Sequence, residues 1–201
     1  GIDVLGTAAC INITPSHNPA DYSGLKFNPI DGGPAGSEIT SKITSLSNEL
    51  MGESIDLSFP ESPDWTKIDI LEAYRTFLQK RGTLDLPKIL NFVKQDNFAL
   101  VCDYVHGSTR GRAEYLLEGI SDLTALRTSD DFLFGGIAPE PSSKNMAGIK
   151  KVLAEKKQAL KLGVIFDPDG DRIRYFDGKV EIDMNRFGAM AFHFMVVHKK
   201  I

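Results

Sequence analysis

The sequence of 201 residues has no long apolar run, no basic leader and only two cysteines. No apolar segment approaches the roughly 18 to 20 residues that a membrane span needs, so we expect neither a membrane segment nor secretion. Both cysteines, Cys10 and Cys102, lie in apolar stretches, which predicts buried free thiols in a reducing compartment and hence the cytoplasm. The net charge of -4 and the absence of basic runs argue against a nucleic-acid-binding surface.

The remaining composition, 42% hydrophobic and 25% charged, is typical of a globular chain. Strand and helix patterns alternate, which predicts an α/β fold of mixed sheets with helices packed on them. The expected strands are residues 1–5, 8–14, 98–103, 123–127 and 162–166, with a hairpin over 173–182. The expected helices are residues 37–51, 67–81, 85–95, 110–118, 144–157 and 185–198.

The segment 52–65 is rich in Ser, Pro, Glu and Asp and has no hydrophobic period. Such a composition is typical of a linker between domains. We therefore predict a first domain over residues 1–60, a second over 61–182, and the opening helix of a third over 183–201.

The segment Asp167–Arg172 carries three carboxylates at alternate positions directly after the apolar run Leu162–Phe166. A buried strand would deliver these side chains to the edge of a sheet, where ligands bind. Because three close carboxylates repel one another, the cluster predicts a bound cation that prefers oxygen ligands, with Mg²⁺ as the first candidate.

Other interpretations of this loop differ in what they require. An EF-hand calcium loop is excluded, because Gly178 stands where the bidentate Glu belongs and Arg172 where the invariant Gly belongs. A magnesium-dependent phosphatase of haloacid dehalogenase type would use Asp167 as its nucleophile, although such motifs usually lie near the start of a domain. A solvated acidic turn without a ligand is the remaining alternative.

A second candidate site is the loop Thr14–Pro19, in which two prolines flank Ser16 and His17. A serine on a rigid loop beside a histidine suggests a nucleophile or a carrier of phosphate. The alternative is a structural turn, because Pro, Ser and Asn are ordinary turn residues. No G-x-S-x-G pattern surrounds Ser16, so a hydrolase nucleophile elbow is not supported.

Together these motifs resemble the α-D-phosphohexomutases, the phosphoglucomutase and phosphomannomutase superfamily. The resemblance rests on the loop Thr14–Pro19, the segments Gly24–Asn28 and Gly32–Ala35, and the loop Asp167–Arg172. Weaker matches are Asp103–Gly107 and the stretch from Gly135 to Pro141. Pro15 and the Gly-Gly-Pro-Ala stretch look closer to the phosphoglucomutase branches.

The resemblance implies a magnesium-dependent isomerase that interconverts hexose 1-phosphate and hexose 6-phosphate through a hexose 1,6-bisphosphate. Phosphorylated Ser16 would carry the phosphoryl group and Lys26, ten residues later, would act as general acid or base. Arg172 would donate to the phosphate, and His17 would contact the phosphate or hold the loop by hydrogen bonding to its backbone. Such a reaction depends on cations and aligned groups around the moving charge.

The implied ligands of Mg²⁺ are Asp167, Asp169, Asp171 and an oxygen on phosphorylated Ser16. The implied fold is two consecutive phosphohexomutase α/β domains, the first of them incomplete. The family's loops for sugar hydroxyls and for the distal phosphate have no match here, and whether residues are missing between Leu5 and Gly6 is not determined. We therefore expect a mutase fragment that is itself inactive; its sugar and its oligomeric state are not determined.

One rival of another class stays open at this point. In it the chain is a non-catalytic module in which phosphorylation of Ser16 and cation binding act as a regulatory switch.

Overall fold

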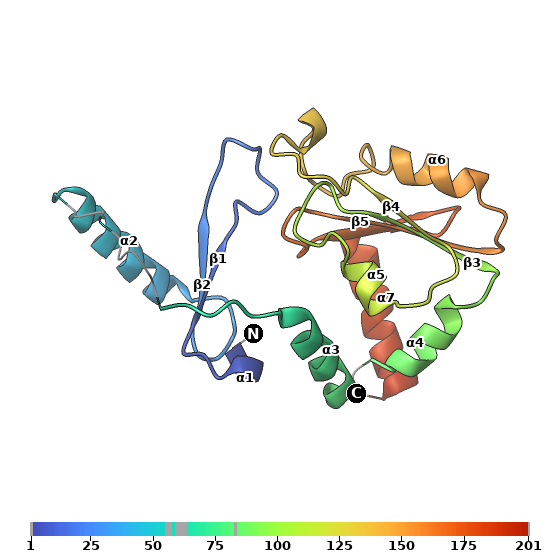
Figure 1. Cartoon of the computed structure of the whole chain (residues 1–201), viewed down its shortest axis with the longest axis horizontal. Coiled ribbons are helices and arrows are strands. Elements are labelled where there is room, and N and C mark those ends of the chain that lie inside the picture. The colour runs from blue at the N-terminus through green and yellow to red at the C-terminus, as the bar shows by residue number, and fades with distance from the viewer. Residues whose placement is uncertain (1, 55–57, 59–63, 83, 201) are drawn as a thin grey trace. The chain divides into compact units, whose positions relative to one another are not determined.

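The computed structural model describes residues 2–54, 58, 64–82 and 84–200, and these form two compact units. The first unit contains the described residues of 1–14 and 24–84, and the second those of 15–23 and 85–201. Helices and a mixed sheet confirm the predicted α/β class (Figure 1). No described helix combines the length and the apolar character that a membrane span requires.

The first unit contains a two-stranded antiparallel sheet and three helices. Its strands pair in the register Cys10 to Asn28 and Ile13 to Leu25. Its elements are α1 (Ile2–Leu5), β1 (Cys10–Ile13), β2 (Leu25–Asn28), α2 (Ser37–Met51) and α3 (Ile70–Arg81). None of the described residues of α2 or α3 is buried. The expected linker over 52–65 lies partly outside the described residues.

Helix α1 shows that our prediction of a strand at residues 1–5 was wrong. The amide of Gly6 donates to the carbonyl of Ile2 at 2.9 Å, and Gly6 adopts a φ of +64°. A single turn can satisfy its own backbone in this way, whereas a strand needs a neighbour. Five residues are also too few to distinguish the two hydrophobic periods.

The second unit is built on a five-stranded sheet in the order β4-β3-β5-β6-β7. Strands β4 (Leu123–Leu126), β3 (Phe98–Asp103) and β5 (Leu160–Phe166) are parallel, while β6 (Ile173–Phe176) and β7 (Glu181–Ile182) are added antiparallel. Asp103, at the end of β3, pairs with Ile165, near the end of β5. The loops that follow these two strands therefore emerge at the same edge of the sheet.

Helices cover both faces of this sheet. Figure 1 shows α6 (Ala147–Glu155) on one side and α4 (Leu86–Val93), α5 (Arg112–Leu116) and α7 (Met184–Phe194) on the other. Alternate residues of β3 serve the two faces: Val101 packs with Ile149 of α6, while Leu100 belongs to the opposite cluster with Val93 of α4. The period of two in the strands thus produces two separate cores.

Two expectations about burial were wrong in part. Cys102 is buried as predicted, but Cys10 is only half-buried; both thiols are free. The helix expected over 185–198 exists as α7 with a π-helical extension over Met195–Lys199. None of its described residues is buried, although a helix as apolar as this one is expected to pack against a core.

Candidate metal and phosphoryl-transfer site

The acidic loop Asp167–Arg172 connects β5 to β6 at the carboxyl edge of the parallel strands. The loop closes on itself, because the amide of Asp167 donates to the carbonyl of Arg172 at 3.2 Å and the amide of Gly170 to the carbonyl of Asp167 at 3.1 Å. Gly170 has a φ of +79°, which glycine adopts without strain. In open α/β sheets this edge is where ligands bind.

The three aspartates converge within this loop. One carboxylate oxygen from each of Asp167, Asp169 and Asp171 lies within 4.8 Å of the others. Asp167 is buried, Asp169 is half-buried and Asp171 is exposed. Three oxygens gathered at the mouth of a loop are the donor type that Mg²⁺ prefers.

The buried carboxylate of Asp167 is electrostatically unfavourable without a counter-ion. Its Oδ1 accepts the amide of Arg172 at 2.9 Å, but its Oδ2 is buried and has no hydrogen-bond partner among the described residues. Burial, followed by the charges of Asp169 and Asp171, raises the pKa of Asp167 from 3.8 to about 6, against the lowering effect of the Arg172 amide. A cation ligated by Oδ2 would relieve both the missing contact and the repulsion, so the residues present fit Mg²⁺.

Ser16 lies in a tight turn with an unusual backbone. Its φ is +59°, a left-handed conformation that few serines adopt. Its Oγ is 3.3 Å from Nδ1 of His17, and the side chain and the amide of Asn18 both donate to the carbonyl of Pro15, at 2.9 and 3.3 Å. Such strain is often found at functional sites, and the turn braces the serine as the prolines suggested.

Lys26 is placed on β2 of the first unit, where it is exposed and pairs across the sheet with Asn12. Ser16 and His17 are grouped with the second unit, as are Arg172 and the three aspartates. The structure thus brings the aspartates together and sets Ser16 beside His17. That all seven residues share one site stays a prediction.

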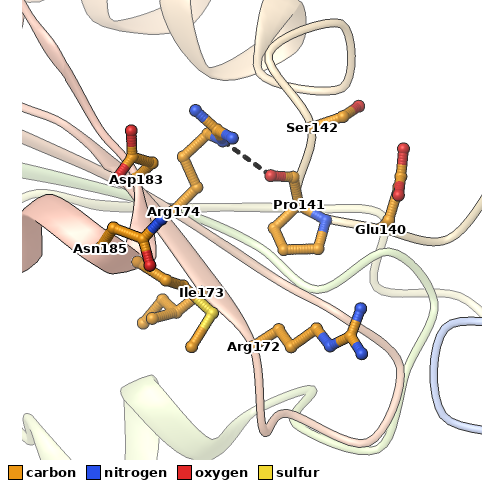
Figure 2. Close-up of a pocket in the computed structure, with 9 residues that line it drawn as sticks. Glu140, Pro141, Ser142, Arg172, Ile173, Arg174, Asp183 and Asn185 are labelled. Carbon is orange, nitrogen blue, oxygen red and sulfur yellow. Dashed lines mark hydrogen bonds between the residues drawn. The ribbon is translucent and has the colours of Figure 1, made fainter. Parts of the chain in front are cut away.

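Arg172 lines a polar cavity of about 340 Å³ next to the acidic loop. Figure 2 shows Arg174 of the same wall turned toward Pro141, whose carbonyl accepts its Nε at 2.7 Å. Arg174 also pairs with Glu181 at 3.3 Å. The guanidinium of Arg172, in contrast, makes no hydrogen bond or ion pair with any described residue, so it is available to bind an anion.

A buried ion pair behind the site did not follow from the sequence. Arg127, just after β4, donates from Nε and Nη2 to Asp103 at 2.7 and 2.6 Å, joining the ends of two strands. Asp103 also accepts the amide of Val105, a β-branched residue at a φ of +46°. The motif Asp103–Gly107 attracted attention as a match to the family, but nothing in it identified Arg127 as the partner.

Two family models match the chain. Residues 2–52 match "Phosphoglucomutase/phosphomannomutase, alpha/beta/alpha domain I", and residues 74–180 match the corresponding domain II. The chain belongs to the phosphoglucomutase/phosphomannomutase family. This confirms the resemblance inferred from the serine loop and the acidic loop.

Individual relatives carry the names of several members of that family. The chain is 31% identical to Phosphoglucomutase 2 of Saccharomyces cerevisiae and 28% identical to a phosphomannomutase of Methanocaldococcus jannaschii. These matches cover 81% and 82% of the chain but only 32% and 34% of the relatives, so the chain spans about a third of their length. A crystal structure from Thermus thermophilus, assigned as a phosphomannomutase, has a TM-score of 0.79 at 27% identity, over 98% of this chain and 43% of that one.

Proposed function

We propose that this chain provides the phosphoserine loop and the cation loop of a phosphohexomutase. The reaction is the reversible conversion of hexose 1-phosphate to hexose 6-phosphate through a hexose 1,6-bisphosphate. The observation that carries the proposal is the acidic trio of this family member, with a buried oxygen of Asp167 that lacks a hydrogen-bond partner among the described residues.

In this proposal Ser16 Oγ gives up its phosphoryl group to a sugar hydroxyl and takes one back from the other end of the sugar. Lys26 accepts the proton of the attacking hydroxyl and returns it in the second half of the reaction. Arg172, whose guanidinium has no partner among the described residues, donates to the phosphoryl oxygens, and His17 steadies Ser16 through its Nδ1. A bound Mg²⁺ supplies positive charge that offsets the charge of the phosphoryl group.

The substrate is proposed only as a hexose phosphate. Relatives of the chain are named phosphoglucomutase, phosphomannomutase and phosphoglucosamine mutase, so their names do not select one sugar. We further propose that the 201 residues alone do not catalyse the conversion of a hexose phosphate, because the family's loops for the sugar and the distal phosphate are not in this sequence. Conversion of glucose 1-phosphate by this chain alone would contradict that part.

The test maps phosphate on the protein that carries this sequence, purified from its own cells. Peptide mass spectrometry should find phosphate on Ser16, which is lost with excess glucose 6-phosphate and regained with glucose 1,6-bisphosphate. A Ser16→Ala variant should carry none, whereas Ser23→Ala, a change later in the connection between β1 and β2, should leave the cycle intact. Phosphate on Asp167 would favour a phosphatase, and phosphoserine that ignores sugars would favour a regulatory module.

A further inference from the structure

The loop after β3 holds the acidic loop in place at the shared edge of the sheet. Ser108 donates twice to the carbonyl of Pro168, from its amide at 2.7 Å and from its Oγ at 3.0 Å. Pro168 lies between the first two aspartates of the trio. The two bonds therefore fix the orientation of the peptide bond between Pro168 and Asp169.

The same two loops also interlock through their glycines. A Cβ on Gly107 would lie 2.5 Å from the Cα and the carbonyl oxygen of Pro168, so only glycine fits there. In return, a Cβ on Gly170 would lie 2.3 Å from the methyl group of Thr109. Each loop thus fills the space that a missing side chain leaves in the other.

The supporting loop is itself anchored away from the acidic loop. Arg110 donates from Nε to the carbonyl of Gly107 at 2.8 Å and pairs with Asp130. His106, at a φ of +59°, donates its amide to the carbonyl of Arg127 at 2.9 Å. These contacts make the loop a fixed support.

We propose that Ser108 is a positioning residue for the cation site, a role that rests on the proposed function because it presupposes a cation there. Its two donors occupy both lone pairs of the Pro168 carbonyl and keep that oxygen out of the coordination sphere. They also hold the backbone so that the three carboxylates face one point. Mg²⁺ tolerates little departure from octahedral geometry, so a loop that rotates at Pro168 binds it less well.

The experiment measures the affinity of the 201-residue chain for Mn²⁺, used as a spectroscopic substitute for Mg²⁺. Electron paramagnetic resonance measures the concentration of free Mn²⁺, and water-proton relaxation reports how the bound ion is coordinated by water. Ser108→Ala removes one of the two bonds to Pro168 and should weaken Mn²⁺ binding about tenfold. Ser108→Thr, which keeps the hydroxyl, should restore the affinity to within about twofold of the parent chain.

Ser121→Ala is the matched control. The Ser121 hydroxyl also donates to a backbone carbonyl, that of Gln95, at 3.0 Å, but near the opposite end of β3. Its loss should leave Mn²⁺ affinity unchanged. Gly107→Ala is a stronger perturbation, since its new Cβ would push on Pro168, and circular dichroism will show whether that variant stays folded.

The outcomes separate the two proposals. A parent chain that takes up Mn²⁺ and a Ser108→Ala variant that binds about tenfold more weakly, with the same unfolding midpoint and with rescue by Thr, supports the positioning role. Equal affinity of Ser108→Ala and the parent overturns that role and leaves the cation site standing. A parent chain that binds no Mn²⁺ overturns both.

Discussion

The buried charge of Asp167 predicts that Asp167→Asn stabilises the cation-free protein. The pKa of Asp167 is raised from 3.8 to about 6, chiefly by burial. One pKa unit corresponds to roughly 1.4 kcal/mol, so the ionised carboxylate costs about 3 kcal/mol in the folded state. Asparagine removes that charge, and its Oδ1 keeps the bond from the Arg172 amide.

The effect has a defined dependence on pH. Below the unfolded pKa of 3.8 the group is protonated in both states, and parent and variant should be equally stable. As the pH rises from there through about 6, the unfolded chain loses its proton first, and the free energy of unfolding of the parent falls by about 3 kcal/mol. The variant lacks this contribution, so its advantage appears within that window and stays constant above it.

The assay is urea unfolding followed by far-UV circular dichroism in EDTA, at pH 4 and pH 8. Saturating Mg²⁺ should reverse the order at pH 8, because only the parent gains stability from the ion. Asp177→Asn is the control: amide donors from Val180 and then Lys179 lower the pKa of Asp177, so that change should destabilise the protein at pH 8. The reasoning would be refuted by an Asp167→Asn variant that is no more stable than the parent at pH 8. It would also be refuted if the variant exceeded the parent in free energy of unfolding by the same amount at both pH values.

Further stability predictions use the same unfolding assay. Arg127→Met should cost roughly 3–5 kcal/mol, since it leaves the buried carboxylate that it pairs with uncompensated; a loss below 1 kcal/mol would contradict this. Gly163→Ala should cost about 1–3 kcal/mol, because its Cβ would lie 2.2 Å from a methyl group of Ile149. An unchanged unfolding midpoint would contradict this, because it would mean that helix α6 moves away at no cost. Glu181→Gln should destabilise the protein at pH 7 but not at pH 3, because hydrogen bonding, first from Lys150, lowers the pKa of Glu181 below 4.5 and this stabilisation is lost as the pH falls; equal losses at both pH values would contradict it.

The elements that the sequence revealed are those whose local pattern matches their tertiary environment. Strand β3 is apolar from Phe98 to Cys102 because both of its faces are covered. The Asp-Gly pair at Asp177 predicted the hairpin in which Gly178 has a φ of +92°. The helix predicted over 67–81 ends where expected, before Gly82, but begins only at Ile70, after the Asp69 cap. Helix α1 was missed because one turn carries no period.

The acidic trio was predictable because its three members lie within five residues of one another after a buried strand. The residues behind it were not, since they depend on contacts between distant loops. Ser108 lies 60 positions from Pro168 in the sequence, and Gly107 is required by space alone rather than by a positive φ. A requirement for glycine that comes from a contact between distant loops cannot be recognised in a single sequence.

The proposal that a phosphate on Ser16 and the aspartates share one cation can be tested by ³¹P nuclear magnetic resonance. Phosphoserine is incorporated at position 16 during translation, and substoichiometric Mn²⁺ is added. The account predicts that the phosphoserine signal broadens strongly in the parent chain and stays sharp in an Asp169→Asn variant. A signal that stays sharp in the parent, or broadens equally in both proteins, would contradict it.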